Sequence, residues 1–440
     1  MLSSGVAVKR YLAVSADFLT ELLHAGQRNL GQRILSTAAL ASRVQPDLLN
    51  NAGSQVANRL NLVQTTEGKT LLFVPKESLS PVPPRTPVFY NPAASINRSV
   101  SVAVTEATEG LTFCDALAGI GARGLRIATE VNRSLAVVMV DINADSIKLG
   151  RRNARLNGVQ ARCDFVPSEA NSFLYSRYGK DEKFGYVDVD PFGTPVPYFQ
   201  AALRATKDGG IASFTATDTA VLCGVHVRVA ERRYGGTPLN NHFHHETGVR
   251  LLLNALRVEA ASLDLGIRPV AVHSTRHYIR VFVRVEVGPS KAEATRESDG
   301  YVFCCSRCSS VGEGRVPERS CEECGGKLKI AGPIWLGDLT ETRTIREAIS
   351  SSARLGLPEA TRVLSSLLEV DSFPPWSFSI EGICSALRIA SVPDARVAEL
   401  LRNQGYKTLR QPLEKTGLKT DAKRAAVVEA VREAAASRRG

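Results

Sequence analysis

The sequence lacks the features of membrane, secreted and low-complexity proteins. Its longest apolar runs, such as Leu135–Val140, are far shorter than the ~18–20 residues needed to cross a bilayer. No long apolar stretch follows the first residues, so we expect no secretory signal. The 34 glycines and 21 prolines are an average share, and the mean hydropathy of −0.07 excludes wholesale disorder. The 440 residues are enough for about three domains.

A disulfide framework is also not indicated. The nine cysteines are an odd number in a chain for which no signal is expected, which favours a reducing cytoplasm. Five of them lie between Cys304 and Cys324. The scattered ones are predicted to be small core residues: Cys114, Cys163, Cys223 and Cys384.

Acidic charge is in the minority. The net charge is +11 and the isoelectric point about 9.3, which fits either a polyanionic partner or a surface charged for solubility. The stretch from Ser391 to Gly440 has 11 basic and 6 acidic residues. A large part of the excess is therefore concentrated in the C-terminal tail, which favours a polyanionic partner there.

The order of the predicted elements indicates an α/β protein. Residues 1–58 are mostly helical in pattern, and residues 59–75 form a strand, a glycine turn and a second strand. From about residue 105 to 285, strands and helices alternate, which predicts a parallel sheet covered on both faces. Residues 288–300 are a polar linker, and the mainly helical, basic remainder follows the cysteine cluster. Ligands of such a sheet bind outside the carboxyl ends of its strands.

A glycine-rich turn follows the first strand of this series. Residues Gly119–Gly124 provide it, and Asp141 ends the next strand about 20 residues later. A carboxylate at that spacing can bind ribose hydroxyls. By itself the pattern fits NAD, FAD or S-adenosylmethionine, or a purely structural turn.

The motif Asp190-Pro191-Phe192-Gly193 ends the fourth strand. It resembles the signature of S-adenosylmethionine-dependent methyltransferases that act on exocyclic amines. A carboxylate that accepts hydrogen bonds from the amine favours positive charge on nitrogen during attack on the methyl group. The neighbouring aromatic ring can stack on a base. The alternative is a structural Asp-Pro turn at the end of a strand.

Two close cysteine pairs predict a structural zinc site. They are separated by 12 residues and can place four thiolates tetrahedrally around Zn²⁺, which leaves no open position for catalysis. The alternative is a set of free or redox-active cysteines. The predicted ligands are Cys305, Cys308, Cys321 and Cys324.

Two further segments carry weaker signals. Phe89 could close over a base, and Arg98 could bind a carboxylate with two hydrogen bonds, although a buried aromatic and a solvated arginine are the simpler interpretation. The histidines His242, His244 and His245 could bind a metal, but methyl transfer needs none. A polar helix cap or an RNA-facing patch is therefore the favoured interpretation of these three.

Together these segments resemble the archaeal and eukaryotic tRNA (guanine-26-N2)-dimethyltransferase family over about residues 62–430. The resemblance implies that Asp190 faces the guanine amine and that Phe89 and Phe192 sandwich the base. It also implies a set of S-adenosylmethionine-binding residues: Arg98, Arg123, Asp141, Glu169 and Ala170. Where the family usually has Asn-Arg-Asp, this chain has Asn-Arg-Ser at residues 97–99. The matching stretches are VFYNPAASINR, DALAGIGARGLR, DVDPFGTPVPYF, FTATDTAVLCG, RRYGGTPLNNHFHHETGVRLLL, HYIRVFVRV, the paired cysteines and GLKTDA.

We therefore predict a Rossmann-like class I methyltransferase sheet with a C-terminal α+β or helical domain that carries the zinc. The predicted domains are a helical extension at 1–58, a methyltransferase domain at 59–288 and a zinc-bearing, tRNA-binding domain at 289–440. The predicted partner is tRNA, with no membrane and no obligate protein partner. The alternatives are a methyltransferase for another RNA guanine amine, or a non-catalytic RNA-binding factor with a relic cofactor fold.

Overall fold

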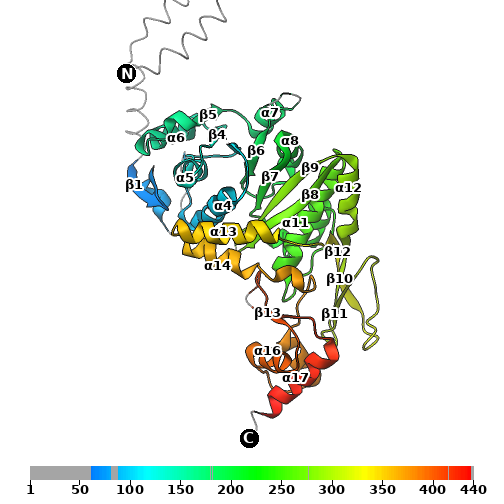
Figure 1. The fold of residues 1–440 in the computed structure, drawn as a ribbon. Helices are drawn as coiled ribbons and strands as arrows, with labels where there is room; N and C mark the ends of the chain where they lie inside the picture. Colours follow the sequence, from blue (N-terminus) through cyan, green and yellow to red (C-terminus); the bar gives the residue numbers. More distant parts are fainter. Residues whose placement is uncertain are drawn as a thin grey trace, which may run out of the picture. The chain divides into compact units, whose positions relative to one another are not determined.

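The computed structural model describes residues 61–80, 88–178, 180, 182–275, 277–414 and 416–437 (Figure 1). The predicted helical extension at residues 1–58 lies outside them.

The predicted strand pair at residues 59–75 is confirmed as an antiparallel hairpin of β1 (Leu62–Glu67) and β2 (Thr70–Pro75). Two asparagine side chains of helix α6 (Ala144–Leu156) and its C-terminal cap bind the hairpin. Asn153 accepts from Phe73 N at 2.8 Å, and Asn157 accepts from Leu71 N at 2.8 Å.

A seven-stranded sheet in the order β5-β4-β3-β6-β7-β9-β8 forms the centre of the fold. Its first five strands are parallel, as predicted, whereas β9 and β8 form an antiparallel pair at one edge. These strands are rich in Val, Ile and Phe because both faces of the sheet are covered. The strands are β3 (Thr112–Asp115), β4 (Ala136–Asp141), β5 (Cys163–Pro167), β6 (Phe184–Val189), β7 (Thr206–Ala216), β8 (Leu265–Ser274) and β9 (Ile279–Val287).

The strand order reverses between β3 and β6, and this reversal distributes the helices. Right-handed crossovers place the helices of the two halves on opposite faces of the sheet. One group contains α4 (Ser95–Ala107), α5 (Ala122–Glu130) and α6, and its members pack on β3, β4, β5 or one another. The other contains α7 (Ala170–Tyr175), α8 (Phe199–Ala205) and α11 (His244–Ala261), with α8 on β6 and β7 and α11 on β8 and β9. Two short helices, α9 (Thr219–Leu222) and α10 (Val227–Tyr234), precede α11.

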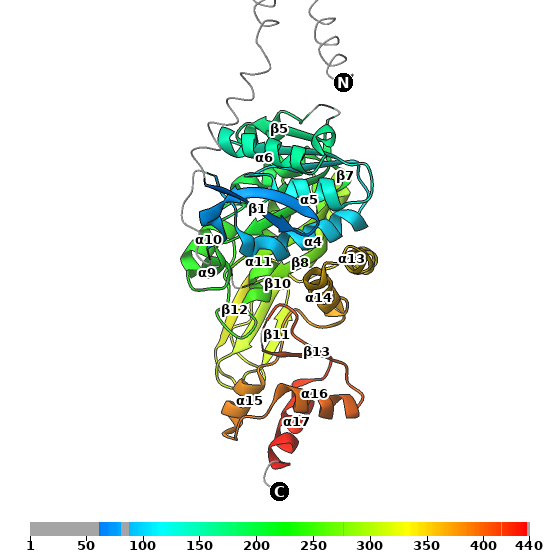
Figure 2. The same cartoon turned by 90° about the vertical axis from the view of Figure 1, so that its left-hand side faces the viewer.

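The segment predicted as a polar linker at residues 288–300 is instead mostly helical. Helix α12 (Pro289–Thr295) packs against β8, because proline at its first position and the following Lys, Ala and Glu residues favour a helix. A second sheet of order β11-β10-β12 follows, and β12 packs against α11 (Figure 2). Its strands are β10 (Asp299–Cys305), β11 (Val311–Gly314) and β12 (Leu328–Trp335).

The remainder of the chain is mainly helical, as predicted. Helices α13 (Thr342–Arg354) and α14 (Pro358–Ser366) pack against α4, so their contacts cross the domain boundary predicted at residue 288. A terminal cluster buries a separate apolar core that includes Val397, Leu401 and Val427. Its elements are α15 (Ile380–Leu387), α16 (Asp394–Asn403), β13 (Thr408–Arg410), β14 (Leu418–Thr420) and α17 (Arg424–Ala436). Among the described residues, no helix combines the length and apolar character that a membrane span needs.

Candidate active site and candidate metal centre

The predicted glycine turn and the predicted Asp-Pro-Phe-Gly motif lie side by side at the carboxyl edge of the sheet. Strands β3 and β6 pair in parallel, with Asp115 opposite Asp188. The glycine turn follows β3, and Asp190 comes directly after β6. Because β3 and β6 flank the reversal of strand order, both loops open at the position where such sheets bind ligands.

Arg123 connects the two loops. It lies in the first turn of α5, its side chain is 4% exposed, and one of its nitrogens donates to Asp190 Oδ2. Its Nε lies 3.1 Å from Asp188 Oδ1, and Nη1 donates to Asn97 Oδ1 at 2.8 Å and to Ser101 Oγ at 2.6 Å. The guanidinium is therefore bound on several sides and fixes the direction of the Asp190 carboxylate.

Asp190 stays ionised in this setting. Burial alone would raise the pKa of this carboxyl group, but the charges of Arg123 and Arg280 lower it below the usual value. About a quarter of the side chain is exposed, in contrast to Asp188, which is fully buried. Asp190 therefore presents a fixed, negatively charged acceptor at the open edge of the sheet.

The sequence analysis did not identify three charged residues behind Asp190. Arg280 on β9 donates to Asp188 Oδ2 and, at 2.6 Å, to Thr215 Oγ1, and it is fully buried. Asp115 accepts from Gly124 N at 3.1 Å. Burial and the charge of Asp188 raise the pKa of Asp115 to about 7. A charge within an otherwise apolar strand was the available signal, because such a charge needs a buried partner. We call this group the sheet-edge cluster: Asp115, Arg123, Asp188, Asp190 and Arg280.

Asp141 lies at the end of β4 and binds the glycine turn. Its Oδ2 accepts from Gly119 N at 2.7 Å, and its Oδ1 accepts from Asn143 N at 2.8 Å. Gly119 and Gly121 have φ angles of +54° and +80°, which side chains rarely adopt. A carboxylate has about four acceptor positions, so two remain for the hydroxyls of a ligand.

Glu169 and Ala170 start α7. Glu169 is the exposed N-terminal cap, and its carboxylate accepts from Asn171 N at 2.9 Å and Ser172 N at 2.7 Å. Burial raises the pKa of Glu169, but these two hydrogen bonds outweigh that effect and lower it overall. Ala170 is buried. β5, which these residues follow, pairs with β4, so both lie on the same edge of the sheet as Asp141.

Arg98 is bound within the protein. Its Nε donates to Glu67 Oε1 at 2.6 Å and its Nη2 to Glu67 Oε2 at 2.5 Å, and Tyr90 donates to the same carboxylate at 2.8 Å. Ser99, the departure from the family pattern, accepts from Arg126 at 2.9 Å. The bidentate carboxylate partner of Arg98 in this structure is therefore Glu67.

Phe89 and Phe192 come together at the surface of the site. Their ring centroids are 4.8 Å apart at an interplanar angle of 83°, and the side chains are 42% and 78% exposed. The carbonyl oxygen of Phe89 lies beside Gly119 of the glycine turn. Two exposed aromatic rings therefore meet edge to face next to the two loops, and a base that stacks between them must separate them.

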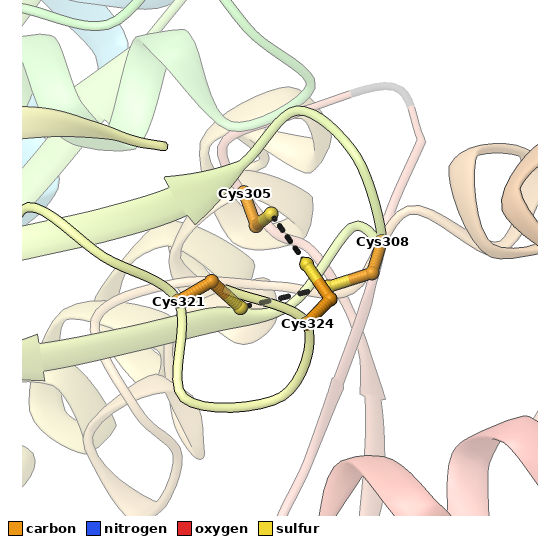
Figure 3. A group of neighbouring side chains, drawn as sticks. All are labelled: Cys305, Cys308, Cys321 and Cys324. Carbon is orange, nitrogen blue, oxygen red and sulfur yellow. Dashed lines mark hydrogen bonds between the residues drawn. The ribbon is translucent and has the colours of Figure 1, made fainter. Parts of the chain in front are cut away.

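The four predicted metal-ligating cysteines converge between β10, β11 and β12 (Figure 3). The Cys305 and Cys324 sulfurs are 3.6 Å apart, as are those of Cys308 and Cys321, and all four lie within 4.8 Å of one another. A disulfide would bring two sulfurs to ~2.05 Å, whereas zinc–sulfur bonds of ~2.3 Å in a tetrahedron place sulfurs ~3.8 Å apart. The donor set and its spacing fit a zinc ion.

Residues of the basic tail and of the histidine segment, both singled out in the sequence, have partners within the fold. Lys419 of the basic tail is fully buried, with its Nζ 2.9 Å from Glu246 Oε2, so this lysine is not available to bind phosphate. His242 Nε2 lies 2.7 Å from the carbonyl oxygen of Ser377, and His244 starts α11. The scattered cysteines are buried, as predicted.

Comparisons with known proteins place the chain in a family. The profile of the family described as N2,N2-dimethylguanosine tRNA methyltransferase matches residues 67–432. Two curated relatives are the tRNA (guanine(26)-N(2))-dimethyltransferases of Methanopyrus kandleri and Methanosarcina mazei, which are 35% and 36% identical to this chain. Each alignment covers 81% of this chain, and it covers 93% and 95% of the respective relative. The solved Pyrococcus horikoshii Trm1 complex with S-adenosyl-L-methionine has a TM-score of 0.74 at 29% identity and covers 84% of this chain and 99% of its own.

Proposed function

Because the chain belongs to the N2,N2-dimethylguanosine tRNA methyltransferase family, we propose that it dimethylates the exocyclic N2 of guanosine 26 in tRNA with S-adenosylmethionine as the methyl donor. The supporting observation is the fixed carboxylate of Asp190 beside the glycine turn at the reversal of strand order. The base is inside folded tRNA and has to be flipped out, at a cost of a few kcal/mol.

Asp190 is the proposed catalytic acceptor. Arg123 holds Oδ2, and the carboxylate accepts a hydrogen bond from the guanine amine, which stabilises the positive charge that develops on nitrogen. Each transfer forms a carbon–nitrogen bond, breaks the carbon–sulfur bond of the donor and releases one proton from the nitrogen. One hydrogen remains after the first transfer, so the same carboxylate can orient the amine for the second.

Phe89 and Phe192 are proposed to sandwich the flipped base. Stacking contributes about 1–3 kcal/mol per base, and the two rings are exposed enough to separate and admit one. This contribution offsets part of the cost of base flipping. Both rings thus act in substrate positioning.

The cofactor is proposed to lie along the ends of β3, β4 and β5. Asp141 has acceptor positions left for ribose hydroxyls, and Arg123, Glu169 and Ala170 lie on the same edge. The sheet-edge cluster presents the ionised carboxylate of Asp190 at the open edge, which favours a cationic sulfonium nearby. Arg98 is proposed to bind the cofactor's carboxylate through Nη1, the guanidinium nitrogen that does not bond to Glu67 or Asn91.

Structural zinc at the cysteine cluster is the second part of the proposal. The four-thiolate set is closed, so the ion stabilises the β10–β12 region, and Arg424 of α17 attaches the terminal helices by donating to Cys308 O at 2.7 Å. We propose that residues 289–440 bind tRNA through exposed basic residues and that the enzyme acts in the cytoplasm.

Purified protein should contain zinc, and Cys321→Ser should lower the zinc content and the unfolding temperature. Metal-free wild type of full stability would contradict this.

Incubation of the protein with labelled S-adenosylmethionine and unmodified tRNA, followed by nucleoside analysis, tests the function. The expected product is N2,N2-dimethylguanosine at position 26, with monomethylguanosine as an intermediate. A tRNA with adenosine at position 26 is the matched control and should incorporate no label there. Label in both tRNAs, or in neither, would overturn the proposal.

A further inference from the structure

A second group of metal-ligating side chains lies outside the cysteine cluster and the sheet-edge cluster. One ligand atom each of Cys223, His244 and His245 lies within 4.8 Å of the others. Cys223 caps the C-terminal end of α9, and the two histidines are the first residues of α11. In the sequence, Cys223 lies about 20 residues before the two histidines, and nothing indicates that it is close to them. The histidines alone therefore indicated a helix cap.

Close backbone approach brings the three residues together. Gly248 of α11 has no side chain where it meets α9, and a Cβ at that position would lie 3.2 Å from the carbonyl oxygen of Leu222. Gly224, with a φ of +85°, lies against the backbone of Asn240 in the segment that leads into α11. Both glycines permit the end of α9 to reach the start of α11, and this contact places Cys223 at the histidines.

The hydrogen bonds of the two histidines leave the lone pair that a metal requires. Nδ1 of His244 lies 2.5 Å from the carbonyl oxygen of Asn241, and Nδ1 of His245 lies 2.8 Å from Glu414 Oε2. A carbonyl or carboxylate oxygen accepts, so in the neutral imidazole that binds a metal each Nδ1 carries the proton and each Nε2 offers its lone pair. Metal-binding histidines almost always donate their other ring nitrogen to a carboxylate or a backbone carbonyl in this way.

The carboxylate partner is itself held in place. Glu414 is 5% exposed and binds His245 twice, through Nδ1 and through the backbone N–H at 2.5 Å to Oε1. The two imidazole rings lie close together and are tilted, with centroids 4.2 Å apart and an interplanar angle of 37°. A simple His–Glu ion pair would explain Glu414 and His245 but gives no reason for a buried thiol and a second oriented imidazole at the same point.

We propose that Cys223, His244 and His245 form a second metal site, which binds a zinc-class divalent cation. One sulfur and two imidazole nitrogens suit Zn²⁺ or Co²⁺ and not Mg²⁺ or Ca²⁺, which prefer oxygen ligands. Bonds of ~2.0–2.3 Å to such an ion place the ligand atoms ~3.3–3.6 Å apart, so shifts of about 1 Å or less close the site. Binding replaces the thiol proton of Cys223, which is released to solvent.

The site connects three parts of the chain. Cys223 is six residues after Thr217, which binds Gly193 of the Asp-Pro-Phe-Gly motif through N–H to carbonyl (2.8 Å) and through its hydroxyl (2.6 Å). The histidines belong to α11, and Glu414 belongs to the C-terminal part of the chain. The cation therefore fastens the segment behind the motif to α11, and three protein ligands leave a fourth position for water or another small ligand.

Cobalt titration of the full-length protein, with the cysteine cluster already filled by one equivalent of zinc, tests the proposal. Zinc binds thiolates more tightly than cobalt, so the filled cluster should not exchange, and a zinc indicator checks for release. The wild type should bind one equivalent of Co²⁺ with the near-ultraviolet absorption of a single cobalt–thiolate bond. Absence of this band at millimolar Co²⁺ would overturn the proposal.

Variants assign the ligands. Cys223→Ala should abolish the thiolate band. Glu414→Gln should weaken Co²⁺ binding at least about tenfold, since outer partners typically change affinity 10–100-fold, and His244→Gln, which removes a direct ligand, should weaken it at least as much. Cys163→Ala and His277→Gln remove the same residue types elsewhere and should titrate like the wild type. Retained zinc at the cysteine cluster and an unchanged circular dichroism spectrum show that a variant folds. If Cys223→Ala does not fold, His244→Gln still supplies the test, because His244 is partly exposed. An unchanged band in Cys223→Ala or an unchanged affinity in His244→Gln would refute the assignment.

Discussion

Two clusters of buried charge both pair carboxylates with basic side chains but differ in the balance of charge and in access to solvent. The sheet-edge cluster has three carboxyl groups and two arginines, and Asp190 in it is about one quarter exposed. The second cluster joins Glu246 on α11 to Arg250 and to Lys419 on β14, and all three side chains are almost fully buried. We call it the helix cluster. One cluster has an excess of acid and opens to solvent, and the other has an excess of base and is closed.

The two charge balances shift the pKa of a buried carboxyl group in opposite directions. In the sheet-edge cluster, burial and Asp188 raise the pKa of Asp115 to about 7. In the helix cluster, burial alone would raise the pKa of Glu246, but Lys419 and Arg250 lower it to about 2. An acid excess at an open edge suits a site that receives positive charge, whereas a closed pair with excess base suits attachment of β14 to α11. The comparison thus separates the proposed reaction site from a cluster that we expect to act in stability.

The largest expected effect is on the closed helix cluster. Lys419→Met leaves Glu246 buried with a lost partner, and breaking a buried ion pair costs about 3–5 kcal/mol of unfolding free energy. Urea unfolding measures this loss, with the exposed Lys407→Met as the matched control, which should stay within about 0.5 kcal/mol of the wild type. A cost below about 1 kcal/mol for Lys419→Met would remove the structural role of the cluster.

The next effect is on the open sheet-edge cluster and concerns the rate rather than the stability. Asp190→Asn removes the charge that favours attack by the amine, and kcat should fall about 10²–10³-fold, as for the loss of one preorganised electrostatic group. Binding of S-adenosylmethionine, measured by calorimetry, should persist. The exposed Asp164→Asn is the control. Turnover of Asp190→Asn within about threefold of the wild type would exclude this carboxylate from catalysis.

Loss of a stacking ring should have a smaller effect. Phe192→Ala removes about 1–3 kcal/mol of stacking, so the KM for tRNA should rise about 5- to 150-fold. The KM for S-adenosylmethionine should not change, because the ring is proposed to stack on the base and not on the cofactor. Leu111→Ala, which removes another exposed apolar side chain, should leave both constants unaltered. If both variants shift the tRNA KM equally, stacking is not the cause.

The smallest effect is a change of slope with pH. The folded pKa of Asp115, about 7, lies above its unfolded value of ~3.9, so the folded state alone keeps this proton between about pH 4 and 7. The contribution of Asp115 is therefore complete below pH 4 and is lost as the pH rises to 7, with a slope of at most ~1.4 kcal/mol per pH unit. Asp115→Asn should remove this slope in urea unfolding at pH 5, 6 and 7. Parallel slopes for variant and wild type would show that Asp115 is ionised throughout.

The local sequence pattern predicted most of the sheet, because apolar runs indicate strands and the glycine turns mark where a strand ends and a helix begins. The strands that end at Asp115, Asp141 and Val189 lie where the sequence indicates, and predicted site residues lie at their carboxyl ends or in the segments that follow. The boundaries were less certain. Helix α5 begins at Ala122, inside the predicted glycine turn, because Gly121 already serves as its cap.

Long-range partners could not be read from pattern. Arg280 binds Asp188 across 92 residues, and Lys419 binds Glu246 across 173 residues. A basic residue in the tail has the same local signature whether it faces solvent or a buried carboxylate. Pairing of this kind depends on how the elements pack, and periodicity over ten or twenty residues does not contain that information.

The antiparallel last pair of strands has a consequence for biosynthesis. Among the described residues, the basic partners of Asp188 are Arg123 and Arg280 of β9, and β9 can add next to β7 only after the chain has passed residue 287. Folding that follows elongation from the N-terminus therefore leaves the reaction edge with an uncompensated acid until the last strand docks. A nascent chain halted before that strand lacks Arg280, one of the two charges that lower the pKa of Asp190, so we expect competence for methyl transfer to arise late in translation.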